Sequence, residues 1–157
     1  SALSIGKYYG VDTKIAAEAI CSYEPSENRS QVIEKKNCTI ILDAYNANPT
    51  SVIKALNNFS NIKGKKIVFL GDMFELGKES KSEHAKIGDI LNDFNFDEVY
   101  LIGDEIKYAF ENYPSAKYFK NKNEVFKIIK RLNLENSTIL FKASRGMQLE
   151  NIAKEID

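Results

Sequence analysis

The sequence predicts an α/β fold built on an open, mostly parallel sheet, with an antiparallel first strand and a short helical segment before it. Two observations support this fold class. Four continuous apolar runs alternate with segments of helical periodicity, as expected for strands that are covered by helices on both faces. The first two candidate strands are separated by only two residues, a turn so short that it joins antiparallel neighbours.

The segment 2–23 is predicted to form a pair of short helices. Gly10 is a plausible end for the first helix, Asp12 is a plausible N-cap for the second, and the apolar residues of the second fall on one stripe. The polar stretch 24–30, with Pro25, then indicates a linker, because proline disfavours a helix at the preceding residue.

After the linker, strands and helices alternate. Strands are expected at 29–35, 38–45, 65–70, 97–102, 117–119 and 137–142, and helices at 49–60, 80–93, 104–112, 122–132 and from about 146. Asn48 as N-cap and Pro49 at the first helical position account for the start of the helix at 49. This alternation is typical of a three-layer, Rossmann-like sheet.

Length and charge exclude several classes of protein. The 157 residues are about one domain, and 22 basic residues balance 22 acidic ones, so no net field favours nucleic acid or an anionic membrane. We expect no membrane span. Cys21 and Cys38 lack metal or redox spacing, which favours the cytoplasm. The chain opens without methionine, and we expect an excised segment rather than a processed chain.

Self-contained catalytic motifs are missing from the sequence. Gly71 and Gly77 are separated by five residues rather than four, and Glu79 follows Lys78 where a P-loop needs Ser or Thr. A dinucleotide-binding G-x-G-x-x-G and a nucleophile elbow are also lacking. His84 is the single histidine and has no second ligand at metal spacing, so we expect it to be structural.

Charged residues follow the predicted strands, at the edge where ligands bind in such folds. Asp43 ends a buried strand and either accepts backbone N–H groups or holds ribose hydroxyls or a metal-bound water. Asp72 and Glu75 either belong to a long turn or accept an ammonium group. Lys142 and Arg145 either form a surface ion pair or bind a carboxylate or phosphate.

Five stretches, in order, resemble the C-terminal domain of Mur ligases: NRSQV, DAYNANPTS, LGDMFELG, HAKIG and KASRGMQLE. The second and third stretches resemble the MurF type, which adds D-alanyl-D-alanine to UDP-N-acetylmuramoyl-tripeptide with ATP in peptidoglycan synthesis. The resemblance covers the whole chain. It implies that residues 1–24 are the tail of a central ATPase domain and that 25–157 are the C-terminal domain.

The resemblance also implies which residues bind ligands. The nucleotide group is Arg29, Asp43, Tyr45, Asn46 and Asn48, and the group facing the dipeptide is Asp72, Met73, Glu75, Ser144 and Arg145. ATP and Mg²⁺ are expected to be bound mainly by the central domain, which this chain lacks. We therefore expect no catalytic residue and no metal ligand here, no ligation by this chain alone, and a monomer.

A different class of protein remains open on the residues alone. A stand-alone α/β ligand-binding or receiver-like module also carries carboxylates at its strand ends and a lysine after its last strand. Lys142 roughly fits that pattern, but no acidic pair precedes Asp43.

Overall fold

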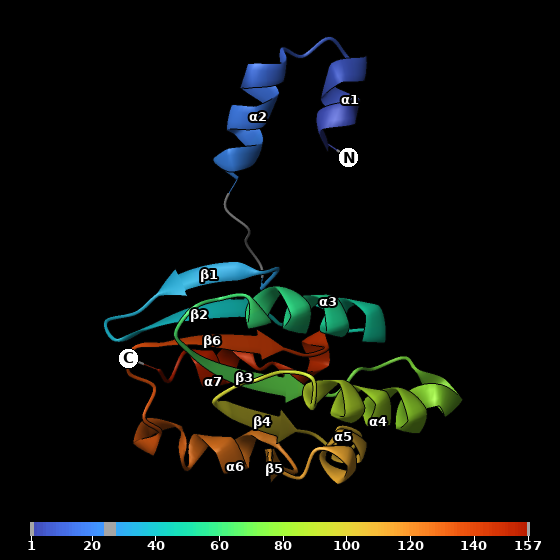
Figure 1. Ribbon diagram of the computed structural model, residues 1–157, viewed down its shortest axis with the longest axis vertical. Coiled ribbons are helices and arrows are strands. Elements are labelled where there is room, and N and C mark those ends of the chain that lie inside the picture. Colours follow the sequence, from blue (N-terminus) through green and yellow to red (C-terminus); the bar gives the residue numbers. More distant parts are fainter. Residues whose placement is uncertain (1, 24–27, 157) are drawn as a thin grey trace.

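The computed structural model describes residues 2–23 and 28–156; the predicted hinge at Pro25 and the boundary between residues 24 and 25 lie outside this part of the chain. A six-stranded sheet has the order β1-β2-β6-β3-β4-β5 (Figure 1). β1 pairs with β2 antiparallel, and all the other neighbours are parallel. The predicted fold class is confirmed.

The strands lie close to their predicted positions. They are β1 (Gln31–Glu34), β2 (Cys38–Asp43), β3 (Lys65–Gly71), β4 (Glu98–Ile102), β5 (Lys117–Phe119) and β6 (Ser137–Lys142). β6, although last in sequence, lies between β2 and β3 at the centre of the sheet. The crossovers that this order requires are long enough to hold helices, as parallel pairing demands.

Helices cover both faces of the sheet and make three layers. One face packs on α3 (Pro49–Ser60), α4 (Ser80–Leu91) and α5 (Lys107–Asn112), and the other on α6 (Lys122–Phe126) and α7 (Glu150–Ala153). Alternate residues of each strand face opposite layers. In β3, Ile67 and Phe69 pack toward α6 and α7, while Val68 and Leu70 pack toward α3 and α4.

Three helix boundaries differ from the sequence prediction. The helix predicted at 104–112 begins at Lys107, because the backbone of 104–106 turns around the Asp72 carboxylate instead. The helix predicted at 122–132 ends at Phe126, and a 3₁₀ turn at Ile129–Arg131 follows it. The last helix begins at Glu150, after a 3₁₀ turn at Arg145–Met147.

A stack of aromatic rings crosses the centre of the sheet. Phe69 on β3 lies 4.5 Å from the ring of Tyr100 on β4 and 4.6 Å from that of Phe141 on β6, with nearly parallel planes. The strand register sets these residues side by side. Burial, with the hydrogen bond from its hydroxyl to Glu98, raises the pKa of Tyr100 to about 12. Such ring pairs stabilise the middle strands beyond the area that they bury.

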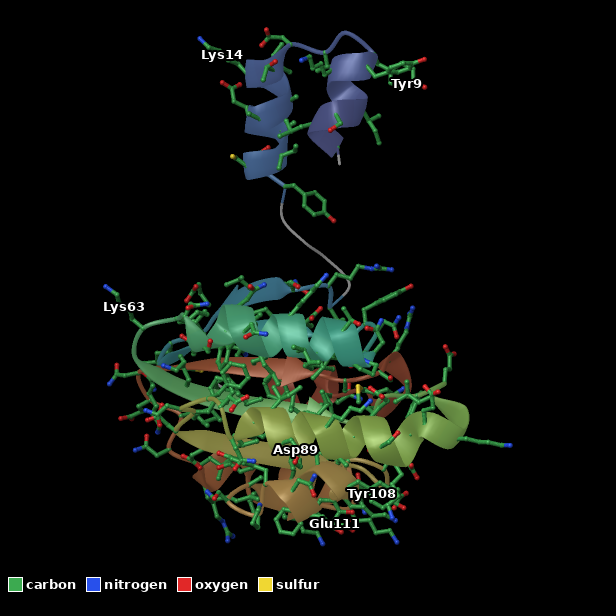
Figure 2. The ribbon with its side chains drawn as sticks, turned by 45° about the vertical axis from the view of Figure 1, so that its right-hand side comes forward. Tyr9, Lys14, Lys63, Asp89, Tyr108 and Glu111 are labelled. Atoms are coloured by element: carbon green, nitrogen blue, oxygen red, sulfur yellow. The ribbon has the colours of Figure 1, made fainter. Side chains whose placement is uncertain are left out.

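The first two helices, α1 (Ala2–Tyr8) and α2 (Thr13–Cys21), stand apart from the sheet (Figure 1). As predicted, the Asp12 side chain caps α2 by accepting from two backbone N–H groups, and Gly10 follows α1 with a positive φ. Neither helix has a buried residue, and apolar side chains such as Ile15 are exposed. Figure 2 shows Tyr9 and Lys14 directed away from the pair.

Gly88 allows α4 and α5 to pack at close range. A Cβ at this position would lie 2.3 Å from the carbonyl oxygen of Ala109 and 2.9 Å from its Cα. Because both contacts are with backbone, Gly88→Ala forces the helices apart, and we expect it to lower the free energy of unfolding by about 2 kcal/mol. Urea denaturation measures this change. In Gly6→Ala on α1, the new methyl meets only side chains at 3.7–3.8 Å; a similar loss there would refute the packing argument.

Candidate functional site

The carboxyl ends of β2, β6, β3 and β4 lie at one edge of the sheet, because these strands are parallel neighbours. The loops that follow them carry the predicted site residues except two: Asp43 is the last residue of β2, and Arg29 precedes β1. Contacts sort these residues into two clusters. We call them the Tyr45 cluster (Arg29, Asp43, Tyr45, Lys142 and Arg145) and the Asp72 cluster (Asp72, Met73, Phe74, His84 and Ser144).

A buried ion pair anchors the Tyr45 cluster. Asp43 and Lys142 are register partners at the ends of β2 and β6, and their charged groups are 2.8 Å apart. The Lys142 side chain is 3% exposed, and its Nζ also donates to the carbonyl oxygen of Asn46 at 2.7 Å. The other Asp43 oxygen accepts from the backbone N–H of Ser30 at 3.2 Å. One carboxylate therefore joins the end of β6 to the chain entering β1.

Two guanidinium groups lie on the ring of Tyr45. The Arg29 Cζ is 3.6 Å from the ring centroid and the Arg145 Cζ is 5.0 Å from it. Both distances are within the range of cation–π attraction, and both arginines are exposed. Arg145, which was expected to face the dipeptide, thus lies with the nucleotide group. Two fixed cations beside a half-buried ring suit a phosphate group.

Asn46 and Asn48 lie in the loop before α3 and stabilise its conformation through hydrogen bonds. Asn46 supplies the carbonyl oxygen held by Lys142. Asn48 is the N-cap of α3: its side chain accepts from the Ser51 N–H at 2.9 Å, and Ser51 Oγ accepts from the Asn48 N–H. The predicted N-cap Asn48 and the proline at the first helical position are confirmed, and the reciprocal bond with Ser51 completes a capping box.

Asp72 follows β3, is 5% exposed, and holds the start of the loop after β4. Its carboxylate accepts from the backbone N–H groups of Asp104, Glu105 and Ile106 at 2.8–3.1 Å. A Cβ at Gly103, where φ is +137°, would lie 2.2 Å from the same carboxylate. These contacts identify Asp72 as a structural acceptor, and its predicted contact with the dipeptide stays a prediction.

The loop after Asp72 is fixed on two sides. Phe74 N–H donates to Ser144 Oγ at 2.8 Å, and Ser144 N–H donates to the Asp72 carbonyl at 3.1 Å. Met73 N–H donates to Nε2 of the fully buried His84 at 2.9 Å. The His84 Nδ1 lies 2.8 Å from the Ser80 carbonyl, so the ring is neutral with its proton on Nδ1. His84 is structural, as expected.

Sequence reasoning missed part of the arrangement. The Met73 side chain is buried in the hydrophobic core, whereas Phe74, absent from the predicted set, is 43% exposed at the rim. Glu75 is exposed with φ of +66°, a strained conformation for a residue with a side chain. The sequence Gly-Asp-Met-Phe at residues 71–74 does not indicate which of these side chains is exposed.

Two kinds of feature, a metal-binding group and a membrane-spanning helix, are absent from the described residues. No group of three His, Cys, Asp or Glu residues within 2–23 and 28–156 could hold a metal ion. No helix in the same part of the chain is long and apolar enough to cross a membrane. The arrangement offers cations for a phosphate, a carboxylate beside them, and an ordered loop with an exposed ring.

The Asp43–Lys142 pair should be important for stability. Lys142→Met leaves a largely buried carboxylate without its counter-charge, and we expect a loss of about 3 kcal/mol in the free energy of unfolding. Urea denaturation at pH 7 measures it. Lys63→Met is the control, because Lys63 extends into solvent (Figure 2), and its effect should stay within about 0.5 kcal/mol. Equal losses in the two variants would contradict the role of the pair.

Asp72 should make stability depend on pH. Burial raises its pKa, although the three backbone N–H groups partly offset this effect. Above the ordinary carboxyl pKa the folded chain therefore binds the proton more tightly than the unfolded chain, and stability falls as pH rises through the raised pKa. We expect the free energy of unfolding of the parent minus that of Asp72→Asn to increase as pH falls from 7 to 4. A flat or opposite profile would exclude this effect.

Comparison with known proteins gives a consistent result. The sequence model of the family described as Mur ligase, glutamate ligase domain matches residues 28–145. The UDP-N-acetylmuramoyl-tripeptide–D-alanyl-D-alanine ligase of Bacillus subtilis is 30% identical, with 99% of this chain and 36% of that protein covered. The chain thus spans about a third of the length of that relative.

Solved structures agree with the sequence match. A crystal structure of MurF from Acinetobacter baumannii superposes with a TM-score of 0.85 at 26% identity, covering 98% of this chain and 35% of that one. MurF from Thermotoga maritima in complex with ADP gives 0.71 at 28% identity, covering 97% and 35%. With the family match extending over most of its length, the chain belongs to the Mur ligase family and carries its glutamate ligase domain.

Proposed function

We propose that this chain is the C-terminal domain of an ATP-dependent ligase that joins D-alanyl-D-alanine to UDP-N-acetylmuramoyl-tripeptide in peptidoglycan synthesis. The observation that carries the proposal is the Tyr45 cluster, where two guanidinium groups and a carboxylate lie beside the ordered 72–76 loop. The relatives of the same name and the MurF structures support the choice of substrate.

In the proposed reaction, the terminal phosphate of ATP is transferred to the tripeptide carboxylate, and ADP leaves. The dipeptide amine then attacks the acyl phosphate, and inorganic phosphate leaves as the amide bond forms. Arg29 and Arg145 would stabilise the transferred phosphate charge, with Tyr45 holding their planes. Asp43 would orient the ribose, and the loop of Asn46 and Asn48 would border the nucleotide.

The loop at 72–76 would face the dipeptide on the other side. Asp72 and Met73 shape the loop through hydrogen bonds, Glu75 is its exposed acceptor, and Ser144 holds its backbone. These contacts give the amine-side loop a fixed form, which supports substrate positioning. The resemblance assigns Arg145 to the dipeptide carboxylate, but its contact with Tyr45 supports a role toward the nucleotide instead.

The remaining parts of the ligase would lie outside this chain. Mg²⁺ and most of the ATP would be held by a central domain, and residues 1–24 would be the tail of that domain. The exposed apolar side chains of α1 and α2, including Leu3, Ile5 and Ile15, support this assignment, because such a face normally packs on a neighbour. We propose a monomeric ligase of the cytoplasm.

The receiver-like alternative has little support in the geometry. Its strand-end carboxylates would have to gather around a metal ion. Asp43 is instead paired with Lys142, and Asp72 accepts three backbone N–H groups. Among the described residues, neither carboxylate belongs to a group of three that could hold a metal ion.

Phosphate release tests the proposed function. With Mg-ATP and UDP-N-acetylmuramoyl-tripeptide, the intact gene product should release phosphate only when D-alanyl-D-alanine is added, since the amine must attack the acyl phosphate. The 157-residue chain should release none under the same conditions, because it lacks a P-loop. If the intact protein does not respond to the dipeptide, the proposed ligase activity is rejected. If the chain alone releases phosphate, the proposal that ATP is bound mainly by a central domain is rejected.

A further inference from the structure

A cavity of about 310 Å³ lies beside the 72–76 loop, at the ends of β3, β4 and β5. Its volume is at the lower end of the range of small-molecule sites. Its lining includes Phe74 and Met147, Asp104, and two lysines that no part of the predicted site contains, Lys120 and Lys122. The lysines lie just after β5 and at the first position of α6.

The walls of this cavity are fixed by contacts of the Asp72 cluster. The Phe74 ring packs on the backbone of Gly146, where a Cβ would lie only 2.6 Å from a ring carbon. Asp72 holds the backbone N–H of Asp104, and Lys122 Nζ donates to the Gln148 side chain at 2.7 Å. The cavity is therefore bordered by the same loops that the proposed function assigns to the dipeptide side.

The charges of the cavity match the carboxyl end of a short peptide. Two lysines supply N–H donors for a carboxylate, and the exposed Asp104 supplies an acceptor for a peptide N–H. The Asp72 carboxylate faces the backbone N–H groups of 104–106, so it presents little free charge to a ligand. Phe74 and Met147 add apolar surface that suits small methyl side chains.

Arg145 lies outside this cavity, so a carboxylate bound in the cavity would need a different cation. The guanidinium expected to bind the dipeptide carboxylate lies on Tyr45, in the other cluster. Arg145 does not line the cavity at the 72–76 loop, whereas Lys120 and Lys122 do. Among the described residues, no hydrogen bond or ion pair occupies the Lys120 ammonium, so it is available to a ligand.

We infer that Lys120 and Lys122 bind the terminal carboxylate of the dipeptide in this cavity. The inference rests on the proposed function, since it names the contact that would orient the dipeptide of that reaction. With its carboxylate held here, the dipeptide would lie along the 72–76 loop with its amine free to point out of the cavity. The two lysines are binding residues and take no part in the chemical steps.

Replacing the carboxylate of the substrate tests the contact directly. The intact gene product is assayed with D-alanyl-D-alanine and with its C-terminal amide, which lacks the charge. We expect the acid to be preferred in kcat/KM by about 10- to 100-fold, the range of charge-assisted hydrogen bonds. In the double variant Lys120→Met/Lys122→Met this preference should fall to near unity through a higher KM for the acid, with the KM for ATP unchanged.

Matched variants separate charge from other effects. Lys127→Met removes an exposed lysine at the end of α6, outside the cavity lining, and should keep the acid preference. Lys120→Arg/Lys122→Arg retains both positive charges and should keep most of the preference for the acid. This variant also shows whether substitution at these two positions disturbs folding. Arg145→Met should raise the KM for ATP and leave the ratio of acid to amide unchanged.

The inference is overturned if the Lys120→Met/Lys122→Met variant keeps the parental ratio of acid to amide, or if Arg145→Met abolishes that ratio instead. It also fails if the parent ligates acid and amide equally well, although the proposed function then stands. A parent that does not use the dipeptide at all rejects the proposed function itself. Assays of the parent protein with the acid and with the amide are enough to tell failure of the inference from failure of the proposed function.

Discussion

The rim of the sheet depends on the buried carboxylate of Asp72. It accepts three backbone N–H groups from the loop after β4, while the Asp72 carbonyl accepts from Ser144 after β6. One residue at the end of β3 thus ties together the loops of both neighbouring strands. Burying a carboxylate is costly unless donors surround it. Here the donors are N–H groups that would otherwise lack partners, because α5 begins only at Lys107.

A second buried charge fixes the other half of the rim. The Lys142 ammonium is 3% exposed and is matched by the Asp43 carboxylate and the Asn46 carbonyl. This pairing also determines where the chain enters the sheet, since Asp43 accepts from Ser30 N–H. The entry point brings Arg29 over Tyr45. The exposed Arg29 side chain would otherwise sample many rotamers. It is held over Tyr45 by a series of contacts that starts from Lys142 on β6.

The sequence predicted the four inner strands, β2, β3, β4 and β6, well because each is a continuous apolar run, as is typical of strands covered by helices on both faces. The start of α3 was also predictable, since Asn48, Pro49 and Ser51 act locally. The start of α5 was not, because the donors at 104–106 are held by a residue more than thirty positions away. Likewise, the resemblance assigned Arg145 to the dipeptide group, whereas its contact with Tyr45 depends on β6 lying beside β2.

The short segment from Lys142 to Met147 contacts both clusters and so fixes their separation. Lys142 and Arg145 face the Tyr45 cluster, while Ser144 and Gly146 hold the 72–76 loop. Residues of one loop at the centre of the sheet therefore set the spacing between the Tyr45 cluster and the 72–76 loop. In a ligase, the two reactants must approach with little freedom. Under the proposed function, this common loop would hold the side that binds the phosphate and the side that faces the amine at a fixed distance from each other.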